Sequence, residues 1–213
     1  MLLIACWSAQ GQVQKKDSVR GDFRPTGIRI GTDAISLVKT FSTSDFKGWE
    51  LNADADFRNY YVVAEVGHWQ RNVDLENGNY TNAGNYWRIG AEVNFLKKDP
   101  IKNMFFFGFR IGHSKYDEKL SYTVTTPEFG TVNKSLENTN LKSNWLELTT
   151  GLKVKIYKSF WMGYTARIKL LPGLHEDLVL QTYDIPGYGL TFKKPWWGFN
   201  YYLMFRVPLP KRS

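Results

Sequence analysis

A strict two-residue alternation of apolar and polar side chains is the feature that most constrains what this chain can fold into. It is clearest in residues 86–95, where apolar side chains hold one set of alternate positions: Trp87, Ile89, Ala91, Val93 and Phe95. Polar or small side chains hold most of the other set: Arg88, Gly90, Glu92 and Asn94, with Tyr86. Because successive side chains of a β-strand point to opposite faces, this segment predicts a strand between an apolar and a polar medium.

The same alternation recurs along the rest of the chain, and helical periodicity is nearly absent. Seven further segments show it: 27–33, 47–57, 59–69, 104–114, 144–156, 160–170 and 198–207. The chain has 213 residues, a length at which an all-β barrel is commonly one domain. The pattern therefore predicts an all-β fold, an eight-stranded antiparallel β-barrel over residues 26–209.

Glycine placement predicts which face of these strands looks inward. The glycines of the predicted strands share the polar face: Gly27, Gly31, Gly48, Gly67, Gly90, Gly108, Gly112, Gly151, Gly163 and Gly198. A narrow eight-stranded lumen needs small residues between large ones, whereas glycine in a solvent-facing strand only weakens it. We therefore expect the polar face inside and the aromatic face toward lipid, which makes this an up-and-down transmembrane β-barrel. The reversed arrangement, a soluble lipocalin-like lipid carrier, is the structural alternative.

The connections between the predicted strands alternate in length. Short turns fall around 57–58, 98–100 and 157–159, and long connections at 34–46, 71–84, 116–142 and 172–196. Outer-membrane barrels have short periplasmic turns and longer external loops. We therefore expect an integral protein of a Gram-negative outer membrane with both termini periplasmic. Within the third long connection, residues 122–126 and 129–132 alternate enough to form a hairpin above the membrane.

Two groups of residues follow from this orientation. We expect inward charges to interlock as a structural lumen network, since an unpaired buried charge is costly: Arg29, Glu50, Asp54, Glu65, Arg88, Glu92, Arg110, Glu147, Lys153, Arg167, Lys169 and Arg206. Aromatic residues near the strand ends predict two interfacial girdles: Trp49, Trp69, Trp87, Phe95, Phe105, Phe160, Trp196, Trp197 and Phe205.

The first residues, MLLIACWSAQGQ, are uncharged and mostly apolar. They resemble the second half of a secretory signal, so we expect residues 1–11 to be a signal peptide whose true start lies upstream. Ala9-Gln10-Gly11 fits a cleavage site, while Leu3-Ile4-Ala5-Cys6 matches a lipobox in which Cys6 would be lipidated. Residues 12–25 would then be a periplasmic N-terminal segment, and 210–213 a periplasmic tail.

Residues that commonly serve in catalysis or metal binding are scarce in this chain. One Cys and three His leave almost nothing for a metal site, and we expect no cofactor. His113 and Ser114 are adjacent and so point to opposite faces of a strand, His68 has no hydroxyl on its face, and His175 lies in a loop. The sequence therefore favours a non-enzymatic protein, with a lipid-modifying enzyme acting at the outer rim as the alternative.

The barrel as a whole resembles the OmpA/OmpX-like and PorT-like small outer-membrane barrels. The runs PTGIRIGTDAISL, FKGWELNADADFRNYYVVAEVGHW and GFNYYLMFRVPLP resemble, more specifically, a family of such barrels from Bacteroidota. The resemblance implies an outer-membrane location and no established activity.

We accordingly predict a scaffold that acts through its extracellular loops, such as an accessory subunit of a secretion or outer-membrane assembly complex. The net charge of +8 favours contact with lipopolysaccharide, outer-membrane lipids or an acidic protein partner. No basic helix or RNA-binding signature points to nucleic acid.

Overall fold

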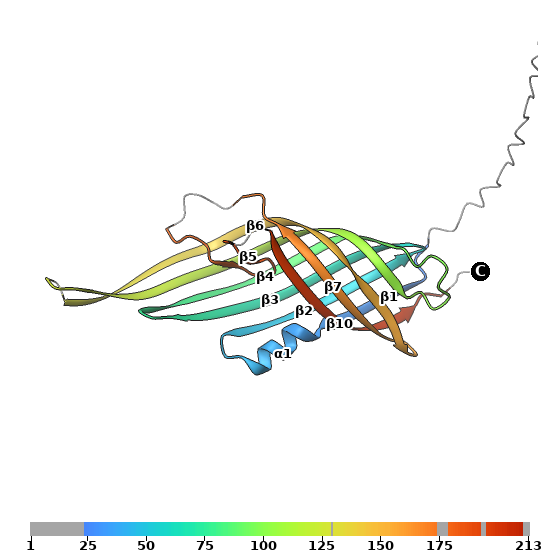
Figure 1. Ribbon diagram of the computed structural model, residues 1–213, viewed down its shortest axis with the longest axis horizontal. Helices are drawn as coiled ribbons and strands as arrows, with labels where there is room; N and C mark the ends of the chain where they lie inside the picture. The colour runs from blue at the N-terminus through green and yellow to red at the C-terminus, as the bar shows by residue number, and fades with distance from the viewer. Residues whose placement is uncertain (1–23, 129, 174–178, 193–194, 211–213) are drawn as a thin grey trace, which may run out of the picture.

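A computed structural model describes residues 24–128, 130–173, 179–192 and 195–210. Its main body is a closed barrel of eight antiparallel strands in the order β1-β10-β7-β6-β5-β4-β3-β2 (Figure 1). The strands are β1 (Gly27–Asp33), β2 (Phe46–Phe57), β3 (Tyr60–Leu75), β4 (Gly78–Asn94), β5 (Met104–Thr126), β6 (Gly130–Tyr157), β7 (Phe160–Leu170) and β10 (Trp196–Pro208). The predicted eight-stranded up-and-down antiparallel barrel is confirmed.

The two faces of the barrel wall differ sharply in chemistry. Phe107, Leu148 and Phe199 point outward and are 51–53% exposed. On the inward face Arg88 is 2% exposed and Glu92 is fully buried. The apolar side chains thus cover the outside, and the charged ones fill the lumen.

Two of the expected long loops are instead strands that continue past the barrel. β3 runs to Leu75 and β4 starts at Gly78, which leaves only a tight turn between them. β5 and β6 pair out to Thr126–Gly130 and form the longest projection in Figure 1. This pairing includes residues 122–126 and 130–132 of the predicted hairpin, and residue 129 lies outside the described residues. The period-two pattern continues beyond the apolar band, but with polar residues on both faces.

The first long connection contains a helix that the sequence analysis did not predict. Helix α1 (Ala34–Ser42) begins directly at the end of β1, and Asp33 caps it by accepting hydrogen bonds from the N–H groups of Ile35 and Ser36, both at 3.3 Å. A side-chain oxygen at this position satisfies free N–H groups of the first turn, which stabilises a short helix. In the described part of the chain, no helix has the length and apolar character needed to cross a membrane.

The middle of the last long connection, within the described residues 179–192, turns back into the barrel. It carries the small hairpin of β8 (Asp184–Ile185) and β9 (Gly189–Leu190). Ile185 and Tyr188 of this hairpin are fully buried and pack against Tyr86 and Trp145 of the barrel strands. Residues 180–191 therefore plug the loop-side end of the lumen, and we call them the plug.

The described ends of the chain lie together at the opposite end, because Gly27 pairs with Pro208. We call this the turn end, and the other the loop end. The predicted signal peptide of residues 1–11 with Cys6, most of the segment 12–25, the tail 211–213 and His175 lie outside the described residues.

Candidate functional site

The lumen contains a balanced network of buried ion pairs. Its five cationic side chains are Arg29, Arg88, Arg110, Lys153 and Arg167, and its five anionic ones are Glu50, Asp54, Glu65, Glu92 and Glu147. All ten are 3% exposed or less. Equal numbers of each sign are what burial demands, since an uncompensated buried charge costs several kcal/mol.

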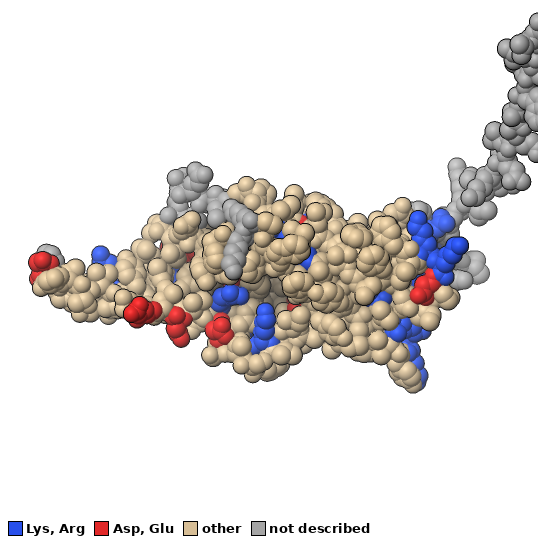
Figure 2. All heavy atoms as spheres, viewed as in Figure 1, with Lys and Arg blue, Asp and Glu red and all other residues tan. Residues whose placement is uncertain are grey.

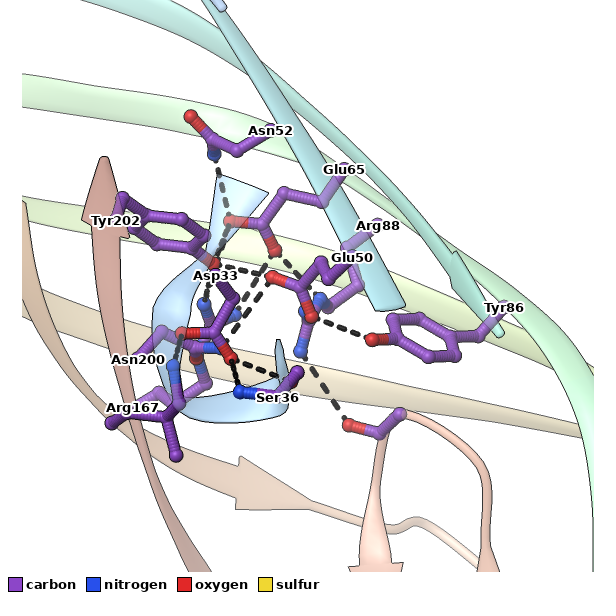
Figure 3. A network of polar contacts seen from close by, with 12 residues as sticks. Asp33, Ser36, Glu50, Asn52, Glu65, Tyr86, Arg88, Arg167, Asn200 and Tyr202 are labelled. Carbon is purple, nitrogen blue, oxygen red and sulfur yellow. Dashed lines mark hydrogen bonds and ion pairs between the residues drawn. The ribbon is translucent and has the colours of Figure 1, made fainter. Parts of the chain in front are cut away.

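Glu65 of β3 lies at the centre of this network (Figure 3). Its carboxylate forms ion pairs with Arg88 (Nε–Oε2 2.6 Å), Arg110 and Arg167 (Nη1–Oε2 3.2 Å). The Tyr202 hydroxyl also donates to it at 2.8 Å. One carboxylate therefore joins the side chains of four other strands across the barrel.

The part of the network closer to the turn end is built around Lys153 of β6. Its ammonium lies 2.9 Å from Oδ2 of Asp54 and 2.6 Å from Oε2 of Glu92. Arg29 lies 2.7 Å from the other oxygen of Asp54. The interlocked side chains occupy the lumen here, and this arrangement is a packed core instead of a channel.

The predicted network residues at the two ends have other partners. Arg206 lies at the turn end and pairs with Asp56 at 2.6 Å, outside the central network. Lys169 lies at the loop end, where its ammonium donates to the carbonyl oxygens of Gly187 (2.7 Å) and Tyr188 (2.9 Å) in the plug. Sequence reasoning could place Lys169 on the inner face but could not find partners in a loop.

Polar contacts hold the plug to the barrel. Arg71 Nε lies 3.0 Å from Oδ2 of Asp184, and Asn82 donates to the Asp184 carbonyl oxygen at 2.6 Å. Burial of its carboxyl raises the pKa of Asp184 to about 6, with Arg71 and Lys169 opposing the shift.

The barrel wall is incomplete above β1. β1 pairs with β10 only as far as Asp33–Tyr202 and with β2 only as far as Thr32–Leu51, although both neighbours continue toward the loop end. Helix α1 lies alongside this interval in Figure 1.

Beyond the end of β1, side chains of α1 and of its cap form hydrogen bonds with backbone groups of β2 and β10. Thr40 Oγ1 accepts from Gly48 N–H (2.8 Å) and donates to the Gly48 carbonyl oxygen (2.7 Å). Asp33 accepts from the N–H of Tyr201 at 3.0 Å and from the amide of Asn200 at 2.9 Å. The helix and its cap thus replace part of a missing strand.

Most predicted girdle residues lie on the outside of the barrel. Trp49, Trp87 and Trp197 are exposed toward the loop end, Phe95, Phe105 and Phe205 toward the turn end, and Phe160 is half-buried. The assignment of Trp69 and Trp196 is wrong, because both pack against the buried cluster around the plug. Trp69 shares the parity of inward-facing Glu65, and Trp196 that of inward-facing Asn200, so the alternation itself carried the signal.

The two described histidines sit on the outer wall beside amide side chains. Nδ1 of His68 lies 2.8 Å from Oδ1 of Asn85, and Nδ1 of His113 lies 2.7 Å from Oδ1 of Asn144. Ser114 points inward and bonds a backbone carbonyl oxygen. Over the described ranges, no group of three His, Cys, Asp or Glu side chains could hold a metal ion.

Comparison with known proteins gives a family and a distant structural likeness. No curated protein matches the chain in sequence. A crystal structure of Ail, the attachment invasion locus protein of Yersinia pestis, in complex with the heparin analogue sucrose octasulfate, is similar at 13% identity and a TM-score of 0.40, over 86% of this chain and 98% of that chain. A family model described as "Domain of unknown function (DUF6048)" matches residues 1–212. The chain belongs to the DUF6048 family.

Proposed function

We propose that the protein is an integral outer-membrane β-barrel that carries out no reaction in its lumen and acts as an interaction scaffold through its loop end. The observation that carries the first part is the sidedness of the wall. Half-exposed side chains such as Phe107 and Leu148 cover the outside, while the charges are enclosed. A soluble lipid carrier needs the opposite arrangement.

The height of the apolar band fits a bilayer. On β6 the outward positions from Leu146 to Ile156 are apolar except for Thr150. Ten steps along a strand, at ~3.3 Å each, span ~33 Å. A tilt of about 40° reduces this to a height of ~25 Å, the thickness of the apolar band of outer-membrane barrels.

The position of the chain ends supports the proposed orientation. Barrels of the outer membrane keep their short turns on the periplasmic side. At the end where Gly27 pairs with Pro208, the turns between β2 and β3 and between β6 and β7 are short, and residues 95–103 connect β4 to β5. At the other end, β3–β4 and β5–β6 project beyond the apolar band as long paired extensions, which is where outer-membrane barrels carry their larger external parts. We therefore place both termini in the periplasm and the β5–β6 hairpin outside the cell.

The β5–β6 hairpin is the part of the loop end best built to meet a partner. β4 pairs with β5 only up to Gly78–Tyr122, and β7 pairs with β6 only from Leu146. Within the described chain, no strand pairs with residues 130–137 of β6 on the side away from β5. A free strand edge can take up an extended segment of another protein through backbone hydrogen bonds.

Two measurements test the membrane placement. We expect the protein to stay with membranes through a carbonate wash, and the folded barrel to migrate faster on a gel before boiling than after it. Release by carbonate would instead support the soluble carrier.

The scaffold role is tested by comparing the full chain with a variant in which Asn-Gly replaces residues 121–135. The shortened hairpin retains Glu118 and Asn138, which contact the plug. After cross-linking in cells, we expect one protein to be recovered with the full chain and lost with the variant. Equal recovery with both, or repeated recovery of the barrel alone, would contradict a scaffold role of this hairpin.

A further inference from the structure

A cavity of about 390 Å³ lies between α1, β2, β10 and the plug, at the interval where β1 is too short to complete the wall. It is lined by residues from both faces of β10: outward-facing Trp197 and Phe199, and inward-facing Gly198 and Asn200. A cavity can touch both faces of one strand only by passing the edge of that strand. The cavity therefore connects the lipid-facing side of the wall with the interior.

Basic side chains outnumber acidic ones along the cavity. Four basic and two acidic side chains line it. Of the basic ones, Arg88 and Arg71 have carboxylate partners. Lys169 is 5% exposed, donates only to two carbonyl oxygens of the plug, and forms no ion pair with any carboxylate of the described residues. The hydrogen-bond partners of its ammonium are thus backbone carbonyls of the plug and not carboxylates, and an anionic ligand in the cavity would add a charge-assisted contact there.

The remaining lining is suited to an apolar chain and to a mouth in the interfacial zone. Phe46, Trp69 and Trp196 line the interior, and Trp197 and Phe199 line the wall beside the opening. Lys39 of α1 stands at the mouth, exposed. Figure 2 shows basic side chains around the hollow next to the helix.

The surface of α1 agrees with contact to lipid. Val38 is 64% exposed and Phe41 is 88% exposed, on a helix of only nine residues that lies outside the wall. A short helix with apolar side chains on one face and lysine nearby is typical of segments that lie in the interfacial region of a membrane.

We infer that this cavity binds an anionic membrane lipid, which enters sideways from the leaflet at the loop end beneath α1. Its phosphate would sit between Lys169 and Lys39, and its acyl chain would leave past Trp197 and Phe199 into the bilayer. The charge of the site selects for an anionic headgroup, and the lateral opening selects for a ligand that keeps its tail in the membrane. This inference rests on the proposed membrane placement, not on the scaffold role.

The test uses the full chain, purified in dodecyl maltoside and titrated with lipids that carry dibrominated acyl chains. Bromine quenches nearby tryptophan fluorescence, and Trp196 and Trp197 line the cavity. We expect dibrominated phosphatidylglycerol to bind at least ten times more tightly than the matched phosphatidylcholine. Lys39→Gln and Lys169→Gln should each weaken phosphatidylglycerol binding at least fivefold.

Lys115→Gln is the matched control, because Lys115 is an exposed lysine at the same end of the barrel on a different wall. It should leave the affinity unchanged. Lys39 lies on an exposed helix face, so its variant tests the site even where Lys169→Gln fails to fold, which the mobility of the unboiled protein on a gel reports.

Three results would overturn the inference. They are equal affinity for the two lipids, equal effects of the Lys39 and Lys115 variants, and full displacement of the lipid by soluble glycerophosphoglycerol at similar concentration. The last result would assign the site to a free anion. Failure of the membrane placement itself would appear separately, as a protein that carbonate releases from membranes.

Discussion

Replacing Glu65 by Gln should destabilise the barrel more than any conservative change on its outer wall. Glu65 forms ion pairs with Arg88, Arg110 and Arg167 and is fully enclosed. The amide keeps the size of the side chain but leaves the five cations of the network with four anions. Breaking a buried ion pair in this way costs about 3–5 kcal/mol, because the remaining charge is buried without compensation.

The free energy of unfolding is measured by urea titration in phosphatidylcholine vesicles, followed by tryptophan fluorescence. Val66→Ala, the outward neighbour on β3, is the control, and its cost should stay below about 1 kcal/mol because the side chain is already half exposed. The double variant Glu65→Gln with Arg110→Gln restores the balance of charge. We expect it to cost less than the sum of its parts by at least about 1 kcal/mol.

Two results would refute this reasoning. A cost of Glu65→Gln below about 1 kcal/mol would mean that water or rearranged side chains compensate the lost charge. Strict additivity in the double variant would mean that the lumen charges do not act as one network.

Three further outcomes follow from the structure. Because the pKa of Asp184 is raised to about 6 by burial, above its usual value of 3.9, its contribution to stability falls as pH rises from about 4 to 6. Protection factors of the plug amides, which are corrected for the intrinsic pH dependence of exchange, should be higher at pH 5 than at pH 7.5, and Asp184→Asn should remove the difference. Gly112→Ala places a Cβ in a steric clash with the ring of Trp145 and should lower the free energy of unfolding by about 1–3 kcal/mol, whereas Gly173→Ala, which meets nothing within 4 Å, should leave it unchanged. Thr40→Val removes the bonds of α1 to the backbone of β2 and should cost about 1 kcal/mol, seen as faster amide exchange there without loss of the folded gel band.

The strands could be predicted because each one carries its own pattern. Alternation in 86–95 places Arg88 and Glu92 on one face of a strand, and the glycines that share this face in the other strands predict that it is the enclosed one. For the two tryptophans wrongly assigned to the girdle, residue type and strand parity indicate different faces of the wall. An aromatic residue near a strand end predicts an interfacial position, but the parity of Trp69 and Trp196 places them inside, where they pack against the buried cluster.

The helix and the plug could not be predicted in the same way, for two physical reasons. Helix α1 is short, and its clearest signal is Asp33 followed by Ser36, a cap that also serves the end of a strand. The plug depends on contacts between residues far apart in the sequence, such as Arg71 with Asp184. The local sequence of this loop, with its Gly and Pro residues, does not predict that the loop folds inward and closes the end of the barrel.

The shortness of β1 has a consequence for how the ring closes. Its ladders, from Gly27 to Asp33 against β10 and from Ile28 to Thr32 against β2, are the two shortest in the barrel. Every other pair of neighbouring barrel strands is joined by a longer ladder of paired residues. We therefore expect the two β1 ladders to be the part of the ring that opens most readily, because the fewest backbone hydrogen bonds hold them.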